Sequence, residues 1–510
     1  MLRVSAVTAL ALAALATPIP AAAELSPKID PALVRAMADA ADGKVEMLVV
    51  LANQADLSAA ASIRGKEAKG RYVFETLSAH AARMQADLIV ELERDKVPHR
   101  SFWVANFLAV EGDLALAERL ALREEVARLE ANPRMSLVAP VEDGVEAGDP
   151  LAPLAIEWNI LKVNADDVWA LGFDGQGAVI GGQDTGYDWE HPALRDMYRG
   201  WTGSSAAHDY HWHDSIHSGG GVCGANSTVP CDDDSHGTHT MGTMVGDDGG
   251  VNQIGMAPGA RWIGCRNMDQ GNGTPTTYSE CFEWFIAPTD LAGQNPNPAM
   301  APHVINNSWS CPPSEGCVAP DILQQVVENT RAAGIVVVVS AGNSGSSCST
   351  VNTPAAIYDA SFSVGSTTST DSISSFSSRG PVTVDGSNRM KPDISAPGSG
   401  VRSSIPGTGY ASFSGTSMAG PHVAGLVALL ISAKPELAGE VDEIEQIIRD
   451  TAFEPAFGGA CGVSAGIFPN NTFGAGRIDA LDAVQLALTG MPFVSDFEEN
   501  DLTEWSAAQP

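Results

Sequence analysis

The sequence predicts a doubly wound, mostly parallel α/β sheet over residues 155–490, preceded by a small α+β domain over residues 24–150. Runs rich in β-branched and other apolar residues, at Gly177–Asp184 and Ile335–Ser340, are typical of parallel strands that are buried on both faces. Helical patterns alternate with such runs, and one of them contains the apolar stretch Leu426–Leu430. A region of more than 300 residues can bury a large core without help from disulfides.

Residues 1–23 have the features of a secretory signal peptide. Arg3 precedes an apolar run, Val7–Leu15, and the small residues Ala21–Ala23 form a cleavage site before Glu24. The apolar run is too short to span a membrane, and we expect no transmembrane helix later in the chain. The protein is therefore expected to be secreted, either outside the cell or into a periplasm.

The small domain that follows shows alternating strand and helix patterns. The predicted strands are 45–52, 102–110 and 135–138, and the predicted helices are 71–95 and 115–130. The stretch Val141–Pro153 mixes Gly, Pro, Asp and Glu, so we expect an exposed linker where proteolysis concentrates.

A candidate nucleophile lies near the end of the larger region. Residues 415–425 read Gly-Thr-Ser-Met-Ala-Gly-Pro-His-Val-Ala-Gly and lead into an apolar helix. The N–H of Ser417 would point out of the helix N-terminus, where partial positive charge favours a developing anion. Gly415 leaves room for a substrate backbone, and Pro421 is expected in the first helical turn, where a missing N–H costs little. The alternative is an ordinary Gly/Ser turn that caps a buried helix.

A serine hydroxyl needs a base to take its proton and a carboxylate to orient that base. The segment Asp234–Gly246 contains His-Gly-Thr-His, whose first histidine is His236. Asp184 ends a predicted strand, and open α/β sheets build their sites at the carboxyl ends of strands. An isolated Asp-Thr-Gly also occurs in aspartic proteases and in turns. Asp184, His236 and Ser417 in this chain order, each inside its own motif, form a much stronger signal.

These motifs resemble those of the subtilisin-like serine peptidases, the subtilases, and of their bacillopeptidase F-like members most closely. The resemblance implies that Asp184, His236 and Ser417 form a catalytic triad and that His239 is a structural partner. It implies that Asn343, in a Ser-Ala-Gly-Asn segment after a strand, donates its amide to the oxyanion hole. An Asn-Gly-rich turn is the alternative for Asn343.

The resemblance also implies where a substrate peptide binds. Ser308, Trp309, Ser310, Ala341 and Gly342 would line the pocket before the scissile bond. An extended peptide would add to the strand edges at Ser308–Ser310 and Asp269–Gly273. These segments carry little charge at the pocket, so an apolar or broad preference is expected. Two departures from the family pattern are Ser310, where a glycine is usual, and Gly181-Gly182-Gln183, where bulkier apolar residues are usual.

The implied function is a secreted serine endopeptidase that hydrolyses peptide bonds through an acyl-enzyme and is made as a self-processed zymogen. Residues 24–150 would be a ferredoxin-like, inhibitor-like propeptide that templates folding and occupies the active site until it is cut. The expected partners are protein or peptide substrates and the chain's own propeptide, with the enzyme a monomer. Three alternatives stay open: a permanent accessory domain in place of a propeptide, a catalytically silent binding protein, and a processing protease with one substrate.

Composition limits the partners and cofactors. The formal net charge is −33, and from residue 151 onward 13 Lys and Arg stand against 40 Asp and Glu, which argues against nucleic acid or an anionic membrane as a partner. No cofactor is expected. Asp232–Asp234 could attract calcium but lacks the spaced ligands of a calcium loop. His208, His211, His213 and His217, with Asp209 and Asp214, suggest a metal site, although a solvent-exposed insertion near the active-site rim is favoured.

All eight cysteines lie between Cys223 and Cys461, and an even number in an exported chain suggests disulfides. Cys223 with Cys231, and Cys311 with Cys317, would close short loops, although eight cysteines allow 105 connectivities. Residues 491–510 are expected to form an acidic tail or the start of a truncated accessory domain.

Overall fold

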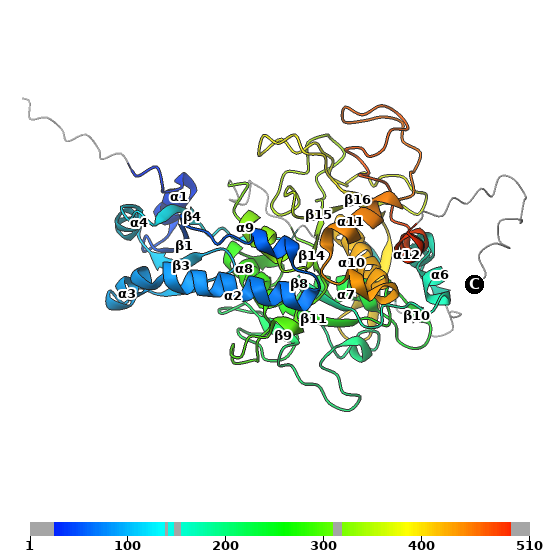
Figure 1. The fold of residues 1–510 in the computed structure, drawn as a ribbon, viewed down its shortest axis with the longest axis horizontal. Helices are drawn as coiled ribbons and strands as arrows, with labels where there is room; N and C mark the ends of the chain where they lie inside the picture. Colours follow the sequence, from blue (N-terminus) through cyan, green and yellow to red (C-terminus); the bar gives the residue numbers. More distant parts are fainter. Residues whose placement is uncertain (1–24, 138–140, 147–154, 310–318, 491–510) are drawn as a thin grey trace, which may run out of the picture.

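The structure is a computed structural model that describes residues 25–137, 141–146, 155–309 and 319–490 (Figure 1). The predicted signal peptide, the expected pocket residue Ser310, the pair Cys311 and Cys317, and the C-terminal stretch 491–510 lie outside the described residues.

The larger unit is built on one seven-stranded sheet whose neighbouring strands all pair in parallel. From edge to edge the strands are β16 (Ile394–Pro397), β15 (Phe362–Thr367), β14 (Val336–Ser340), β13 (Val304–Asn307), β8 (Val179–Asp184), β11 (Arg261–Arg266) and β9 (Trp212–Asp214). The chain runs from β8 to the edge strand β9, returns to β11 between them, and then crosses to β13 on the other side of β8. The carboxyl ends of β8 and β13 therefore flank a topological switch point, where ligands bind in sheets of this kind.

Helices cover both faces of this sheet, which confirms the predicted doubly wound fold (Figure 1). One face is covered by α10 (Thr416–Ala433), α7 (His236–Val245) and α12 (Ala480–Thr489), and the other by α8 (Pro275–Ile286) and α9 (Gln324–Ala332). Along β14, Val336 and Val338 join the first core, whereas Val337 and Val339 join the second. Successive residues of a strand point to opposite faces, so a strand covered on both sides reads as one continuous apolar run.

Helix α10 is long and apolar enough to cross a membrane by composition, with a mean hydropathy of 1.4, and it is the one helix of which this holds in the described part of the chain. Length and composition alone therefore do not distinguish this helix from a membrane span, but its place in the fold does. The physical reason is its position: 89% of the helix is buried inside the fold, so its apolar surface faces protein on all sides.

Shorter elements complete the larger unit. They are β7 (Ala155–Ile156), α5 (Trp158–Lys162), α6 (Ala165–Ala170), β10 (Asn252–Gln253), β12 (Asn272–Gly273), β17 (Val401–Ile405), β18 (Gly409–Ser414) and α11 (Val441–Asp450). Strand β7 pairs with β10, and β17 and β18 form an antiparallel hairpin beside α7.

The N-terminal unit is a four-stranded antiparallel sheet in the order β2-β3-β1-β4, with helices packed on it. Its elements are α1 (Pro31–Asp39), β1 (Val45–Leu51), α2 (Lys66–Met84), α3 (Ala86–Arg94), β2 (His99–Phe102), β3 (Phe107–Gly112), α4 (Leu114–Ala121) and β4 (Val126–Ala131). After α1, the β-α-β-β-α-β arrangement with this strand order is ferredoxin-like.

Three predicted elements of this unit were wrong in detail. The helix over 71–95 is two helices, because the chain bends at Gln85, whose buried amide donates to the Phe102 carbonyl and to the Asn106 side chain. The strand over 102–110 is a hairpin that turns through Asn106, a residue with a φ of 42°. The predicted helix over 115–130 ends at Ala121, and Val126–Ala131 pairs with β1, because pairing across the sheet outweighs the local helical pattern.

The two units pack against each other, with α2 lying across the larger unit (Figure 1). At the N-terminal end of α2, the Lys66 ammonium donates to the Ala301 carbonyl at 2.5 Å and the Lys69 ammonium donates to the Gly439 carbonyl at 2.6 Å. The hairpin of β2 and β3 also meets the larger unit, where β2 contacts α8. The N-terminal unit therefore contacts the larger unit at separated points.

The glycines before Asp184 have a packing reason. A Cβ at Gly182 would lie 2.3 Å from the Tyr187 hydroxyl, and one at Gly181 would lie 2.7 Å from the Phe285 ring. Large aromatic side chains from both faces thus fill the space that bulkier strand residues would occupy. Gln183, which is fully buried, bonds to the side chains of Asn307 (2.5 Å) and Asn267 (2.9 Å) in the neighbouring segments.

Candidate active site

Asp184 and His236 meet at the carboxyl end of β8. The Nδ1 atom of His236 lies 2.7 Å from Oδ1 of Asp184, and both side chains are almost completely buried. The same carboxylate accepts the N–H of Thr185 at 2.8 Å. With Nδ1 protonated and bound to Asp184, Nε2 is left with the lone pair that a general base needs. Nε2 is buried and has no hydrogen-bond partner among the described residues.

Two opposing effects set the proton affinity of His236. Burial disfavours its charged form, but the negative charges of Asp184, Asp234 and Asp232 and the hydrogen bond to Asp184 raise the pKa of His236 above its ordinary value. A base whose conjugate acid is stabilised in this way accepts a proton from a hydroxyl more readily.

Two further histidines in the motifs have structural roles. His239 places Nε2 near the carbonyl oxygens of Val401 (3.1 Å) and Ala411 (3.0 Å), and burial lowers its pKa to about 3. His422 contacts the Met418 carbonyl through Nδ1 and Asn159 through Nε2, and burial lowers its pKa to about 4. Both side chains are therefore neutral at physiological pH and cross-link buried segments.

Ser417 is the second residue of α10, which packs against α7. Its hydroxyl donates to the Ser308 carbonyl at 3.2 Å, and no hydrogen bond joins it to His236 in the described residues. In return, the Ser308 hydroxyl donates to the Ser417 carbonyl at 3.0 Å. The Ser417 hydroxyl is thus not hydrogen-bonded to His236 in this structure, and such bonds are often long or poorly aligned before a substrate binds.

The hydrogen bond from the Ser308 hydroxyl to the Ser417 carbonyl depends on Pro421. The helix begins at Thr416, so Pro421 lies in its second turn and not in the first turn as predicted. A proline has no N–H, and the carbonyl four residues earlier, that of Ser417, loses its helical partner. The Ser308 hydroxyl replaces that partner and ties the end of β13 to the nucleophile segment.

Asn343 is oriented by Thr416. Its Oδ1 accepts the Thr416 N–H at 2.8 Å and the Thr416 hydroxyl at 2.9 Å. Because an N–H can only donate, this contact fixes which end of the amide faces Thr416 and leaves the Nδ2 donors on the other side. The Ser417 N–H lies in the first turn of α10, where backbone donors have no helical partner. Thr416 was not predicted to matter, and only the folded geometry shows its role.

Ser417 and Asn343 border a small cavity of about 10 Å³. It is lined by Leu137, Ser308, Trp309, Ser340, Gly342, Asn343, Thr416 and Ser417. The structure thus brings three of the five expected pocket residues, Ser308, Trp309 and Gly342, to one place. Ala341 is buried and does not line the cavity. Leu137, from the N-terminal unit, was not expected to line it.

Leu137 follows a short strand that pairs with the predicted substrate edge. Strand β5 (Met135–Ser136) is antiparallel to β12, and the Leu137 N–H donates to the Gly271 carbonyl at 2.6 Å. Met135 is fully buried in a cluster that includes Tyr278 and Trp309, whose rings stack 4.0 Å apart. Farther along, β6 (Val141–Glu146) pairs antiparallel with β18 and places Val141 opposite Ser414. The chain therefore adds a strand on each side of the Ser417 segment.

The histidines at 208–217 do not converge on a metal site. His208 bonds to the Tyr198 hydroxyl, His211 to the Ala207 carbonyl, and His213 and His217 to Glu280. Within the described ranges, no three His, Cys, Asp or Glu side chains are arranged to hold a metal ion. The expected solvent-exposed insertion is also wrong in part, because Trp212–Asp214 forms the edge strand β9 and Trp212 is buried.

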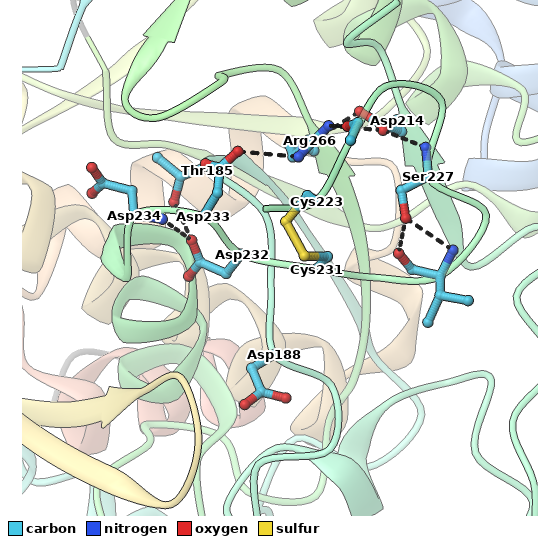
Figure 2. Close-up of a disulfide and its surroundings, with 12 residues drawn as sticks. Thr185, Asp188, Asp214, Cys223, Ser227, Cys231, Asp232, Asp233, Asp234 and Arg266 are labelled. Atoms are coloured by element: carbon cyan, nitrogen blue, oxygen red, sulfur yellow. Dashed lines mark hydrogen bonds and ion pairs between the residues drawn. A yellow bond between two sulfur atoms is a disulfide. The ribbon is translucent and has the colours of Figure 1, made fainter. Parts of the chain in front are cut away.

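Three disulfides join cysteines of the larger unit within the described ranges. Cys223–Cys231 confirms one predicted pair, and the other two, Cys265–Cys281 and Cys348–Cys461, span 16 and 113 residues. The first closes the loop that ends just before Asp232 (Figure 2).

Comparison with known proteins decides the family. A profile described as the Subtilase family matches residues 175–476, more than half of the chain. This chain belongs to the subtilase family. Bacillopeptidase F of Bacillus subtilis (strain 168) is 36% identical over 442 residues, which is 82% of this chain and 29% of that protein. Subtilisin E of the same strain is 30% identical over 283 residues, 55% of this chain and 62% of the relative. Subtilisin DY of Bacillus licheniformis is 33% identical over 286 residues, which is 56% of this chain and 87% of that relative.

The subtilase therefore spans less than a third of Bacillopeptidase F and less than two thirds of Subtilisin E. The match to Bacillopeptidase F covers 82% of this chain, so it extends well beyond the region 175–476.

Proposed function

We propose that this subtilase is a secreted serine endopeptidase that is made as a zymogen and cuts its own chain. The pairing of the chain on both sides of Ser417 carries the proposal. Met135–Leu137 lies on β12 with Leu137 against the nucleophile cavity, and Val141–Glu146 lies on β18. A substrate that adds to strand edges in this way is bound through its backbone, without dependence on side-chain identity.

In the proposed reaction, the Ser417 hydroxyl attacks the substrate carbonyl while His236 Nε2 takes the hydroxyl proton. Asp184, at 2.7 Å from Nδ1, stabilises the imidazolium that forms. The amide of Asn343 and the N–H of Ser417 donate to the oxygen of the tetrahedral intermediate. His236 then gives the proton to the leaving amine, which leaves an acyl-enzyme on Ser417. A water molecule, deprotonated by the same histidine, releases the acid and restores the serine.

The first substrate in this proposal is the chain itself. The segment that joins Leu137 to Val141 connects the two flanking strands, so we place the processing site between these residues and slightly before the expected linker at 141–153. After the cut, Met135 and Leu137 keep the N-terminal unit in the substrate position as an inhibitor. Met135 is buried, which also supports an apolar preference in other substrates at the position that Met135 occupies here.

The test compares the wild-type chain with Ser417→Ala. The wild type should convert to a shorter chain, with a new N-terminus between Leu137 and Val141, and a fluorophosphonate should label Ser417. Ser417→Ala should remain full length, since loss of the nucleophile costs roughly a million-fold in turnover in subtilisin. A folded wild type that is neither cut nor labelled would contradict the proposal and favour a silent binding protein.

A further inference from the structure

The carboxylate of Asp232 joins the loop that follows Asp184 to the first turn of the helix that carries His236 (Figure 2). It accepts five hydrogen bonds: at Oδ1 from the Thr185 hydroxyl (2.8 Å) and the N–H groups of Asp234 and Ser235 (3.0 Å each), and at Oδ2 from the N–H (2.9 Å) and hydroxyl (2.6 Å) of Thr238. Each carboxylate oxygen thus accepts hydrogen bonds from the first turn of α7 or from the residues just before it, and Oδ1 also accepts one from Thr185.

Helix α7 depends on these bonds because it lacks an ordinary cap. Ser235 precedes the helix with a φ of 100°, and its side chain makes no capping bond. A non-glycine residue in the left-handed region costs on the order of 1–3 kcal/mol and persists only where its surroundings hold it. Asp232 bonds to the Ser235 N–H and supplies the missing acceptor for Thr238. The Thr185 hydroxyl accepts the N–H of Gly237 at 3.0 Å.

Asp232 itself stands on a rigid base. Cys231 before it is fixed by the disulfide to Cys223, and Asp233 after it bonds to Arg266 at 3.1 Å. Arg266 is fully buried and also binds both oxygens of Asp214 at 3.0 Å (Figure 2). Such bidentate pairing fixes both partners in direction as well as in distance.

The loop on this base is also in direct contact with the loop after Asp184. The Tyr187 N–H donates to the Cys231 carbonyl at 3.2 Å. A Cβ at Gly186 would lie 1.8 Å from that same oxygen, so the two backbones touch where Gly186 has no side chain. The position of Asp232 relative to Asp184 is therefore set by backbone contact and not by flexible side chains.

We propose that Asp232 is a positioning residue for the acyl-transfer reaction, which holds the His236 imidazole on Asp184 through Thr185 and helix α7. The inference rests on the proposed function. Thr185 spans the gap, because its N–H donates to Asp184 at 2.8 Å while its hydroxyl donates to Asp232. A displacement of about 1 Å at a catalytic group can lower turnover roughly a hundredfold, so a clamp at this point has a measurable effect.

The test is Asp232→Asn, which keeps the shape but can accept hydrogen bonds at only one end. We expect kcat to fall by about tenfold to a hundredfold with KM within about twofold of wild type, and the rate of fluorophosphonate labelling of Ser417 to fall in parallel. The negative charge of Asp232 also helps to raise the pKa of His236, so the acid limb of kcat/KM should move to lower pH in the variant. A purely structural loss would not move that limb.

The matched control is Asp188→Asn. Asp188 lies in the same region (Figure 2), and its carboxylate accepts the N–H groups of Glu190 and Gly407. Its link to α7 is made by its backbone N–H, which donates to the Thr238 hydroxyl at 3.0 Å and is kept in the variant. Its kcat should equal that of wild type. Thr185→Val should lower kcat, Thr185→Ser should restore it, and Thr185→Val combined with Asp232→Asn should be less than additive, because both changes remove the hydrogen bond that the two residues share.

Asp232→Asn with the kcat and pH profile of Asp188→Asn would overturn the inference. If Asp232→Asn does not fold, as judged by its circular dichroism, Thr185→Val decides, and a wild-type kcat in that variant overturns the inference as well. A wild type that is not labelled at all would refute the proposed function and this inference with it. A labelled wild type beside an unimpaired Asp232→Asn would refute the inference alone.

Discussion

The contact between the N-terminal unit and α8 should make the association of this unit with the larger unit depend on pH. Glu283 of α8 accepts the backbone N–H groups of Trp103 (2.8 Å) and Val104 (3.1 Å) from the turn after β2. Burial raises the pKa of Glu283 to about 8, and the two N–H bonds oppose this shift only in part. Once the N-terminal unit leaves, this carboxyl returns to solvent and to an ordinary pKa near 4.5.

The direction of the pH dependence follows from this difference between the bound and the free pKa of Glu283. A carboxyl whose pKa is raised in the bound state contributes binding free energy that is fully present below pH 4.5 and is lost as the pH rises towards 8. Each pH unit between these values changes the dissociation constant by up to tenfold, so the upper limit is roughly three-thousandfold, or about 5 kcal/mol. The N-terminal fragment should therefore stay bound after self-cleavage at pH 5 and dissociate at pH 8.

The ionisable groups beside Glu283 do not all titrate in the same pH range. Hydrogen bonds from His213 and His217 hold the pKa of Glu280 at about 2 against the effect of burial, so Glu280 stays charged and keeps its 2.7 Å pair with Arg100. The hydrogen bond to Glu280 raises the pKa of His217 above its ordinary value, so this histidine can titrate in the same range. A variant at Glu283 alone separates the two contributions.

The variant is Glu283→Gln. One carboxylate oxygen of Glu283 accepts both N–H groups, and the amide oxygen of glutamine can replace it without titrating. The assay is the fraction of N-terminal fragment that co-elutes with the mature chain in gel filtration at pH 5, 6.5 and 8. We expect a strong pH dependence in the wild type and a much weaker one in Glu283→Gln. The same pH dependence in both chains would refute the role of Glu283.

Three further outcomes are expected. Asn343→Ala should fold and bind substrate with an unchanged KM but lose about a hundredfold to a thousandfold in kcat, the loss known for the same donor in subtilisin, and near-normal turnover would remove Asn343 from the mechanism. Gly182→Ala should lower the free energy of unfolding by about 1–3 kcal/mol in denaturant titrations, because its Cβ would lie 2.3 Å from the buried Tyr187 hydroxyl. EDTA should change neither the peptidase rate nor the melting temperature, and a loss of either would revive a metal site.

The sequence was informative where the signal is local. The continuous apolar run of β14, with Val337 and Val339 on one face and Val336 and Val338 on the other, correctly indicated a strand covered on both sides. The pair Cys223 and Cys231 could be suggested because the two cysteines lie only 8 positions apart. It failed where local patterns compete with pairing: Val126–Ala131 reads as a helical face but is held as a strand by β1.

The candidate site shows the same contrast between residues in local motifs and contacts between distant segments. Asp184, His236, Asn343 and Ser417 each lie in a motif that can be read from neighbouring residues, so the sequence alone could name them. Their supports lie far away in the chain: Thr416 orients Asn343, and Ser308 takes the place of the N–H that Pro421 lacks. No spacing rule links such partners, because they meet only when the parallel strands bring separate loops to one edge.

What the sequence by itself determined is therefore the kind of chemistry and the class of fold, since both depend on residue types in short, continuous segments. The tertiary structure alone decided how that chemistry is held and covered. It joins Asp232 to Thr185 across 47 positions and pairs Met135–Ser136 with Asn272–Gly273. The physical reason is that hydrogen bonds and packing act over a few ångströms in space, whatever the distance along the chain, and only the folded chain sets distances in space.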